Sequence, residues 1–185
     1  MKILIRILSS LCLHIVASSF ASGISYGADL VQIKNAELVG SFRQVKLSLG
    51  DSARLFPGKA VGQMQKYNGG GAMKMEQKKS LKFTIQNSAT KTAETFTVQF
   101  LIVGRDLKSN KNKVIEKEDA SVILNPRENK EITSKEISTE YYVDSGKTMG
   151  IKVVGHAIQV YRGNQLVAES YSQNDFKDFF NASAN

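Results

Sequence analysis

The chain has 185 residues, of which 42% are apolar and 23% charged, with two prolines, one cysteine, two histidines and no tryptophan. This composition excludes a disordered or collagen-like chain, and a single cysteine excludes a disulfide framework within it. The formal net charge of +8 is compatible with acidic glycans, anionic surfaces or acidic partner proteins.

The first 23 residues predict an export signal. A short basic start is followed by the mostly apolar stretch Ile7–Phe20 and then by small residues. That stretch is shorter than the roughly 20 residues that span a membrane. We therefore expect a secreted, periplasmic or outer-surface protein without a transmembrane anchor after cleavage. An uncleaved amphipathic start of a cytoplasmic protein is the alternative.

Cleavage after residue 23 would leave residues 24–185, a length typical of one domain. The loss of Lys2 and Arg6 leaves 23 basic and 17 acidic side chains, a net charge of +6. The loss of Cys12 and His14 leaves His156 as the remaining histidine and no cysteine. We expect a single β-sandwich domain that folds without disulfides.

Short runs with apolar residues at every second position predict antiparallel strands that have one face on a core and the other in water. Seven or eight strands with little helix between them indicate an all-β protein, an immunoglobulin-like antiparallel β-sandwich. The strands would come from nine such runs, Leu30–Leu38, Gln44–Leu49, Leu81–Gln86, Phe96–Val103, Ser121–Leu124, Glu131–Ser138, Met149–Val154, His156–Tyr161 and Leu166–Tyr171.

Two strands can be described in more detail. Phe96–Val103 becomes continuously apolar, which predicts a central strand covered on both faces. Residues 158–168 predict a β-hairpin. We favour a three-residue loop over Arg162–Asn164 above a two-residue Gly163–Asn164 loop, because it places apolar side chains on one face.

The C-terminus predicts the one short helix. Ser172 and Asp175 form a loose capping box, and Phe176, Phe179 and Phe180 recur at helical spacing. The aromatic face either closes one end of the sandwich or serves as a docking patch for a partner.

Two loops carry candidate contact residues. The segment Gln63–Lys79 surrounds three glycines, and Tyr67 and Asn68 in it are typical of adaptable binding loops, although a mobile connection explains it equally well. A basic loop follows the strand that ends at Val103. It could recognise an acidic surface or form a solvated hairpin tip; its cations are Arg105, Lys108, Lys111 and Lys113.

The sequence predicts no catalytic, metal-binding or cofactor-binding residues. His156 has no nucleophile motif near it, and the triglycine lacks the flanking pattern of a phosphate loop. Residues 144–146 (Asp-Ser-Gly) predict a turn rather than a calcium loop, because they lack the alternating acidic ligands that calcium needs. We interpret the other acidic clusters as solvated surface charge rather than paired glycosidase carboxylates. They are Glu116, Glu118, Asp119, Asp175 and Asp178.

A family resemblance follows from three segments, Leu81–Asn87, Phe96–Phe100 and Leu124–Ile132. They resemble exported immunoglobulin-like and fibronectin-III-like modules, in which a strand ending in Asn leads to its partner and a proline turn precedes the next strand. The closing stretch Gly155–Glu169 resembles small exported proteins of verrucomicrobial bacteria, some of them pilus-associated. The Cys…Trp…Cys core of antibody domains is absent.

The resemblance implies a non-catalytic interaction module of the cell envelope or a surface appendage that binds other proteins. An extracellular carbohydrate-binding module for acidic glycans is the alternative, and a secreted hydrolase is a third possibility. We expect no cofactor and no nucleic-acid partner.

Overall fold

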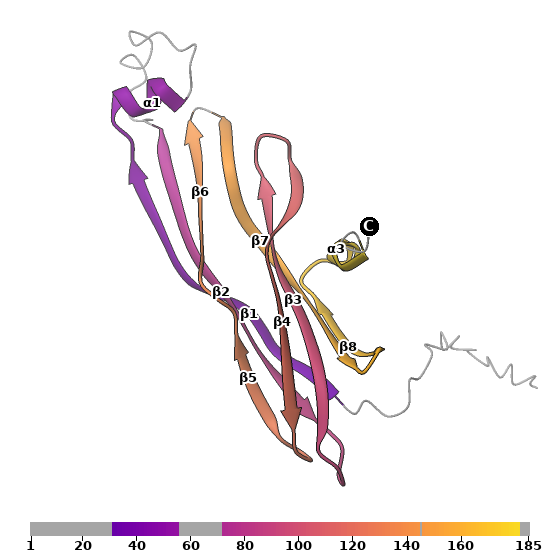
Figure 1. Ribbon diagram of the computed structural model, residues 1–185. Coiled ribbons are helices and arrows are strands. Elements are labelled where there is room, and N and C mark those ends of the chain that lie inside the picture. Colours follow the sequence, from indigo (N-terminus) through magenta and orange to yellow (C-terminus); the bar gives the residue numbers. More distant parts are fainter. Residues whose placement is uncertain (1–30, 56–71, 145, 182–185) are drawn as a thin grey trace, which may run out of the picture.

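The computed structural model describes residues 31–55, 72–144 and 146–181. The predicted export signal, Tyr67 and Asn68 lie outside these residues. The elements are β1 (Val31–Lys46), α1 (Leu49–Leu55), β2 (Met73–Asn87), β3 (Glu94–Asp106), β4 (Lys111–Leu124), β5 (Asn129–Thr133), β6 (Ile137–Asp144), β7 (Lys147–Arg162), β8 (Gln165–Tyr171), the 3-10 turn η1 (Asn174–Lys177) and α3 (Asp178–Asn181) (Figure 1).

The strands form an immunoglobulin-like antiparallel sandwich, as predicted. In the first sheet β2 pairs with β1 on one side and with β5 and then β6 on the other. In the second sheet the order is β8-β7-β3-β4. The two sheets are continuous at one end, where β6 pairs with the start of β7 (Figure 1). Figure 1 shows that β1, β2 and β7 each run most of the length of an elongated molecule.

The core lies between the two sheets, where the alternating apolar side chains meet. Phe83 of β2 and Phe100 of β3 contact each other across the interface, with ring centroids 5.3 Å apart and planes at 69°. Such edge-to-face pairs contribute about 1 kcal/mol beyond the burial of their surface. The predicted central strand is confirmed: Phe100 and Ile102 of β3 face this core, whereas Leu101 and Val103 belong to a second cluster on the outer face.

The outer face of the first sheet is polar, and its charges are paired. Lys74 lies 2.9 Å from Glu76 and 2.6 Å from Glu140, and these hydrogen bonds raise its pKa. Lys82 pairs with Glu131 at 3.0 Å. Neighbouring strands thus match cations with carboxylates here, as expected for a solvated sheet face.

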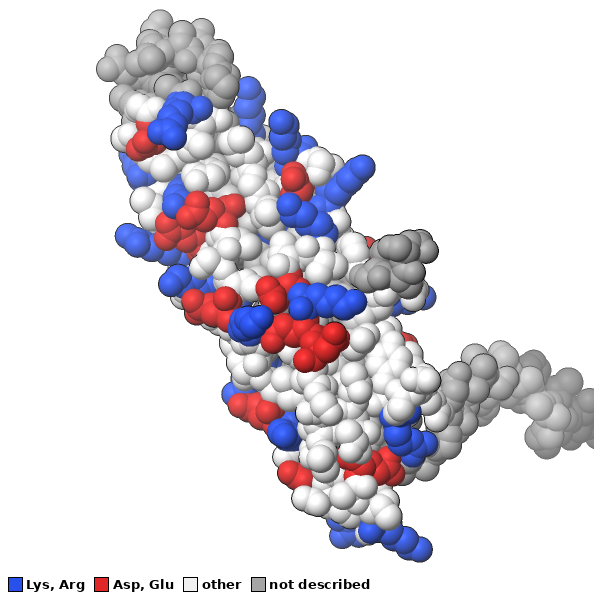
Figure 2. Space-filling view, viewed as in Figure 1, with Lys and Arg blue, Asp and Glu red and all other residues white. Residues whose placement is uncertain are grey.

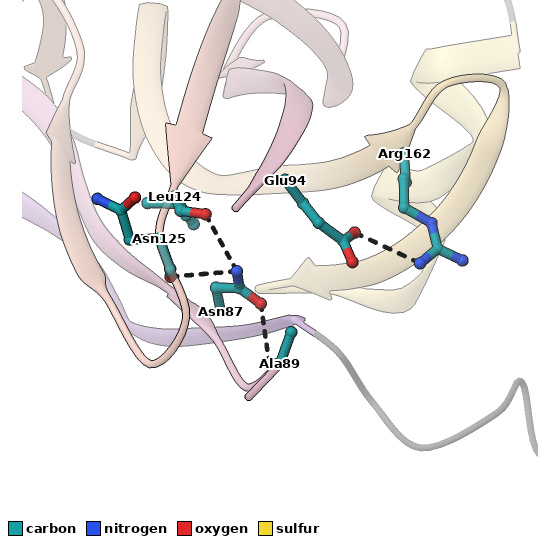
Figure 3. Close-up of polar contacts among 6 residues, drawn as sticks. All are labelled: Asn87, Ala89, Glu94, Leu124, Asn125 and Arg162. Atoms are coloured by element: carbon teal, nitrogen blue, oxygen red, sulfur yellow. Dashed lines mark hydrogen bonds and ion pairs between the residues drawn. The ribbon is translucent and has the colours of Figure 1, made fainter. Parts of the chain in front are cut away.

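The connections gather at the other end of the sandwich around the buried Asn87 (Figure 3). Its Nδ2 donates to the carbonyl oxygens of Leu124 and Asn125, both at 3.1 Å. Its Oδ1 accepts the N–H of Ala89 at 2.9 Å. One amide therefore ties the end of β2 to the β4–β5 turn. In the same view Arg162 pairs with Glu94 at 3.4 Å.

Several boundaries differ from the predicted ones. The predicted loop 63–79 is shorter, because β2 begins at Met73 and already pairs with β1 and β6 there. Two predicted runs merge into β1 and two into β7, and α1 was not predicted. In β7 a bulge between Val153 and Gly155 lets the strand continue past the junction of its two runs. In β1 the residues between the two runs continue the strand because they pair with β2.

The hairpin β7–β8 has a two-residue loop, not the favoured three-residue one. Arg162 pairs with Gln165, and Gly163 adopts the positive φ of +58° that such tight loops need. A bulge then shifts the register between Val160 and Tyr161, so the apolar residues still reach the core.

Candidate functional site

The C-terminal helix lies on the outer face of the second sheet, not at the end of the sandwich as one reading predicted. Phe176 is fully buried against Leu101, Val103 and Ala157. Phe179 and Phe180 are half-buried at the margin of the same cluster. Phe176 is therefore a structural residue, whereas the other two also present part of their rings to solvent.

The predicted capping box does not form. Gln173 rather than Ser172 precedes η1, and no side chain caps it. The Ser172 hydroxyl instead accepts the His156 N–H at 2.8 Å and donates to the His156 carbonyl at 3.1 Å. Ser172 thus fixes the helix to β7 and has no hydroxyl left for capping.

The predicted basic loop is the tip of the β3–β4 hairpin, and its cations point to different sides. Arg105 follows Val103 by two residues on β3 and therefore faces the side that carries α3. Lys113 pairs with Gly104 and faces the opposite side, with Lys111 two residues away. Lys108 lies in the turn, where Asp106 accepts its backbone N–H at 2.9 Å. The structure therefore brings Arg105, but not the lysines, onto the face of the aromatic helix.

Four polar side chains form a hydrogen-bonded chain on the same outer face. The Tyr161 hydroxyl donates to Gln159 Oε1 at 2.6 Å, and Gln159 Nε2 donates to the Tyr171 hydroxyl at 2.7 Å. Tyr171 in turn donates to Glu169 at 2.8 Å, and its ring contacts Phe180. Gln159 is only 7% exposed, so both tyrosines are held by a buried amide. We call these four residues the tyrosine network.

The environment of the tyrosine network keeps its hydroxyl groups protonated. Burial is the main cause that raises the pKa of Tyr171 to about 12, and the Glu169 carboxylate adds to it. Burial also raises the pKa of Tyr161. Both phenols are therefore hydrogen-bond donors over the physiological pH range.

Next to the tyrosine network lies an area of small and apolar side chains. The register places Thr97 of β3 between Tyr161 of β7 and Ser121 of β4, and Thr95 opposite Ile123. Ile123 is 65% exposed, an unusual value for a large apolar residue. Figure 2 shows mixed charges at mid-height, and a largely uncharged area over the lower part of β4. Together with the tyrosine network, these residues form what we call the β3–β4–β7 face.

His156 is buried in the middle of β7, and burial lowers its pKa. It pairs with Ile102, whose side chain belongs to the core. Cross-strand partners share a face, so the imidazole points inward rather than at a substrate cleft.

The predicted surface acids lie apart. Glu116, Glu118 and Asp119 are in β4 rather than in a turn, and two of them contact Lys135: Glu118 accepts its N–H at 2.9 Å and Glu116 lies 3.8 Å from its Nζ. Asp175 and Asp178 begin η1 and α3. Within residues 31–55, 72–144 and 146–181, no group of acidic, histidine or cysteine side chains could hold a metal ion.

A hollow of about 440 Å³ lies on the first sheet, at the bulge of β1. It is lined by Asn35, Ala36, Glu37, Lys82, Phe83, Thr84 and Glu131. Lys82 and Glu131 pair with each other in its floor. It contains none of the predicted site residues.

Sequence reasoning missed Tyr161, Tyr171 and Ile123 as surface residues of interest. The alternation in residues 158–168 does place Gln159 and Tyr161 on one face of the predicted hairpin, opposite the apolar residues. Their pairing with Tyr171 depends on the register of the hairpin, which a bulge sets.

None of the helices in the described part of the chain is long and apolar enough to cross a membrane.

No protein-family model and no curated protein matches the chain. A β-D-glucoside glucohydrolase from Trichoderma reesei is 10% identical over 76% of this chain and 18% of its own length, with a TM-score of 0.34. A β-glucosidase from Kluyveromyces marxianus is 15% identical over 52% and 13%, with a TM-score of 0.26. The chain thus spans less than a fifth of either enzyme.

A crystallised protein from Akkermansia muciniphila is 15% identical over 78% of this chain and 72% of its own, with a TM-score of 0.29. This neighbour comes from a verrucomicrobial bacterium, as do the exported proteins of the predicted resemblance, and that resemblance stays a prediction. These likenesses carry no argument about function.

Proposed function

We propose that this chain is an exported, non-catalytic interaction module of the cell envelope or of a surface appendage, and that it binds another protein through the β3–β4–β7 face. The tyrosine network carries the proposal. The buried Gln159 forms hydrogen bonds with Tyr161 and Tyr171 through the two ends of its amide. These bonds fix both tyrosine rings in the unbound protein. Rigid tyrosines lose little entropy on binding and are common anchors of protein interfaces.

The composition of the β3–β4–β7 face supports the same function. Its centre consists of hydroxyl and apolar side chains, among them Thr97 and the exposed Ile123. Charged residues lie on the outer strands, at the two ends of the register row Glu169–Gln159–Gln99–Asp119 that runs from β8 to β4. Protein interfaces have this arrangement, with charged residues depleted at the centre and present at the rim. The polar, charge-paired outer face of the first sheet lacks it.

The absence of catalysis is also part of the proposal. His156 points into the core, and the acids of β4 are spread along a strand. A general acid or base needs to reach a substrate, which neither arrangement favours. Activity assays on polysaccharides and esters with the His156→Ala variant as comparison test this part; turnover that depends on His156 would contradict it.

The binding function is tested by isolating the tagged chain from the cells that produce it. We expect Ile123→Glu to remove reproducible partner proteins, because it places a charge at the centre of the face. Ser138→Glu, which adds the same charge at an exposed position of the first sheet, is the control. Equal recovery with both variants would contradict the assignment of the face.

Acidic glycans remain a second candidate, favoured by one observation. The half-buried rings of Phe179 and Phe180 lie on the face that also carries Arg105, so aromatic and cationic groups occur together. An array of sulfated and uronate glycans tests it. Binding that is lost in Phe180→Ala and in Arg105→Gln would support it over protein binding.

A further inference from the structure

Three strands place Lys152, Arg105 and Asn112 side by side in one row. Arg105 of β3 is the register partner of Lys152 on β7 and of Asn112 on β4. Register partners lie about 5 Å apart and share a face. Val103 and Val114, two residues from Arg105 and Asn112, pack in the cluster under α3. The row therefore lies beside the aromatic helix, about 7 Å further along the strands.

The two cations of this row have no carboxylate partner among the residues that the structure describes. Like charges directly opposite each other destabilise a sheet. Elsewhere the chain avoids this cost: Lys74 bridges Glu76 and Glu140, and Lys78 lies 3.8 Å from Glu136. In the row, the third position is the neutral Asn112, and Lys152 is exposed. An anion from outside the chain would therefore relieve the repulsion between Arg105 and Lys152.

Asn112 also orients the guanidinium. The Arg105 Nε–H donates to Asn112 Oδ1 at 3.0 Å, and Arg105 is half-buried. This hydrogen bond leaves the two terminal nitrogens of Arg105 available for a carboxylate, which arginine binds with two parallel hydrogen bonds. Lys152 adds a second positive charge beside them. The arrangement is a prepared acceptor site for a carboxylate.

We infer that the row Lys152–Arg105–Asn112 binds side-chain carboxylates of an acidic segment on the partner protein. The inference rests on the proposed function, because the row lies on the same side of the second sheet as the β3–β4–β7 face. Charge complementarity selects the occupant: Arg105 and Lys152 lie opposite each other, and Lys108 follows in the turn of the hairpin, so that these cations attract a run of Asp or Glu residues. Arg105 and Lys152 contact the carboxylates, and Asn112 positions Arg105.

The experiment is an NMR titration of the isotope-labelled chain with a peptide of alternating Glu and Ser, and with its Gln counterpart. We expect the Glu peptide alone to shift the Arg105 Nε–H signal. Replacing either contacting cation by Gln, in Arg105→Gln or Lys152→Gln, is expected to weaken binding about fivefold or more. Lys113→Gln removes the same charge from the other face of the hairpin and is the matched control, with a change below about twofold.

Asn112→Asp provides a second test that unfolding cannot mimic. The new carboxylate would pair with Arg105 within the chain, so we expect it to abolish peptide binding without lowering the unfolding temperature. Equal weakening by Lys113→Gln, or binding of the Gln peptide, would overturn the inference. Preferential binding of a uronate or sulfated oligosaccharide through Arg105 would overturn it too, in favour of a glycan.

Failure of this inference can be told apart from failure of the proposed function. If Arg105→Gln leaves partner recovery unchanged while Ile123→Glu removes the partner, the row is not part of the contact but the face is. If neither variant changes recovery, the proposed function itself fails.

Discussion

Gly155 of β7 lies directly beneath the ring of Phe176. A Cβ atom at Gly155 would stand 2.7 Å from Phe176 Cε2 and would also meet the Ser172 hydroxyl. This close approach allows η1 to pack against the second sheet. The apolar cluster that forms there separates the Arg105 row from the tyrosine network.

Gly155→Ala is therefore expected to lift the C-terminal helix while the sandwich stays folded. Forcing a methyl group into a packed site costs about 1–3 kcal/mol in the free energy of unfolding. Hydrogen–deuterium exchange should rise over residues 172–181 and remain unchanged in β2 and β3. Gly50→Ala is the control, because the nearest atom that a Cβ would meet there is Ser48 Oγ at 4.0 Å. Unchanged exchange at the C-terminus would contradict the packing described.

Asn87→Ala is expected to destabilise the domain strongly. It removes the donor to the carbonyls of Leu124 and Asn125 and the acceptor of the Ala89 N–H, all of which lie at one buried corner. Leaving such groups unsatisfied costs about 2–4 kcal/mol. Denaturant unfolding measures the loss, with the exposed Asn129→Ala expected to change stability by less than about 0.5 kcal/mol. Similar values for both variants would show that the corner contributes little.

Stability should fall as the pH drops below neutrality because of His156. Burial lowers the pKa of this histidine in the folded state below its ordinary value of 6.5, so the unfolded chain binds the proton first. The resulting loss of unfolding free energy is absent above pH 6.5, and it grows as the pH falls toward the pKa of His156 in the folded state. His156→Gln should flatten the curve of unfolding free energy in this window. An identical slope in the variant would assign the pH dependence to other groups.

Tyr171 should produce the opposite behaviour at alkaline pH. Its pKa is raised to about 12, mainly by burial, against an ordinary value of 10. Its contribution to stability is therefore fully present below pH 10 and is lost as the pH rises toward 12. Tyr171→Phe should remove part of this alkaline loss, measured by thermal unfolding at pH 8, 10 and 11. It should also free Gln159 and Glu169 from their shared partner, whereas the exposed Thr97→Ala leaves the alkaline profile unchanged.

The sandwich could be predicted because the alternation of apolar and polar residues along a strand shows which of its faces is buried. Phe96–Val103 predicted β3 and its two covered faces, and three aromatic residues at helical spacing predicted the terminal helix. Strand ends were less predictable, since Gly150 and Gly155 suggest breaks in a sequence where β7 in fact continues. Ser172 was assigned to a cap because the sequence does not show that the backbone of His156 occupies its hydroxyl.

The candidate site was predictable only in part. Arg105 and the aromatic residues were singled out separately, and their common face depends on how β3 and the helix pack. Lys152 has no sequence signal that connects it with Arg105. Their pairing depends on a bulge that shifts the register of β7 against β3 between Val103 and Gly104. A bulge of one residue moves side chains to the other face, so the row follows from tertiary structure alone.

Site-specific photo-cross-linking in the producing cells tests the central claim most directly. A photoreactive residue would replace Thr97, Ser121 or Ile123 on the β3–β4–β7 face, and Thr133 or Ser138 on the outer face of the first sheet. All five positions are exposed, so each reports the proteins that lie against it. The account predicts one reproducible partner from the first three positions and none from the other two. The same proteins from both sheets, or cross-links from the first sheet alone, would contradict it.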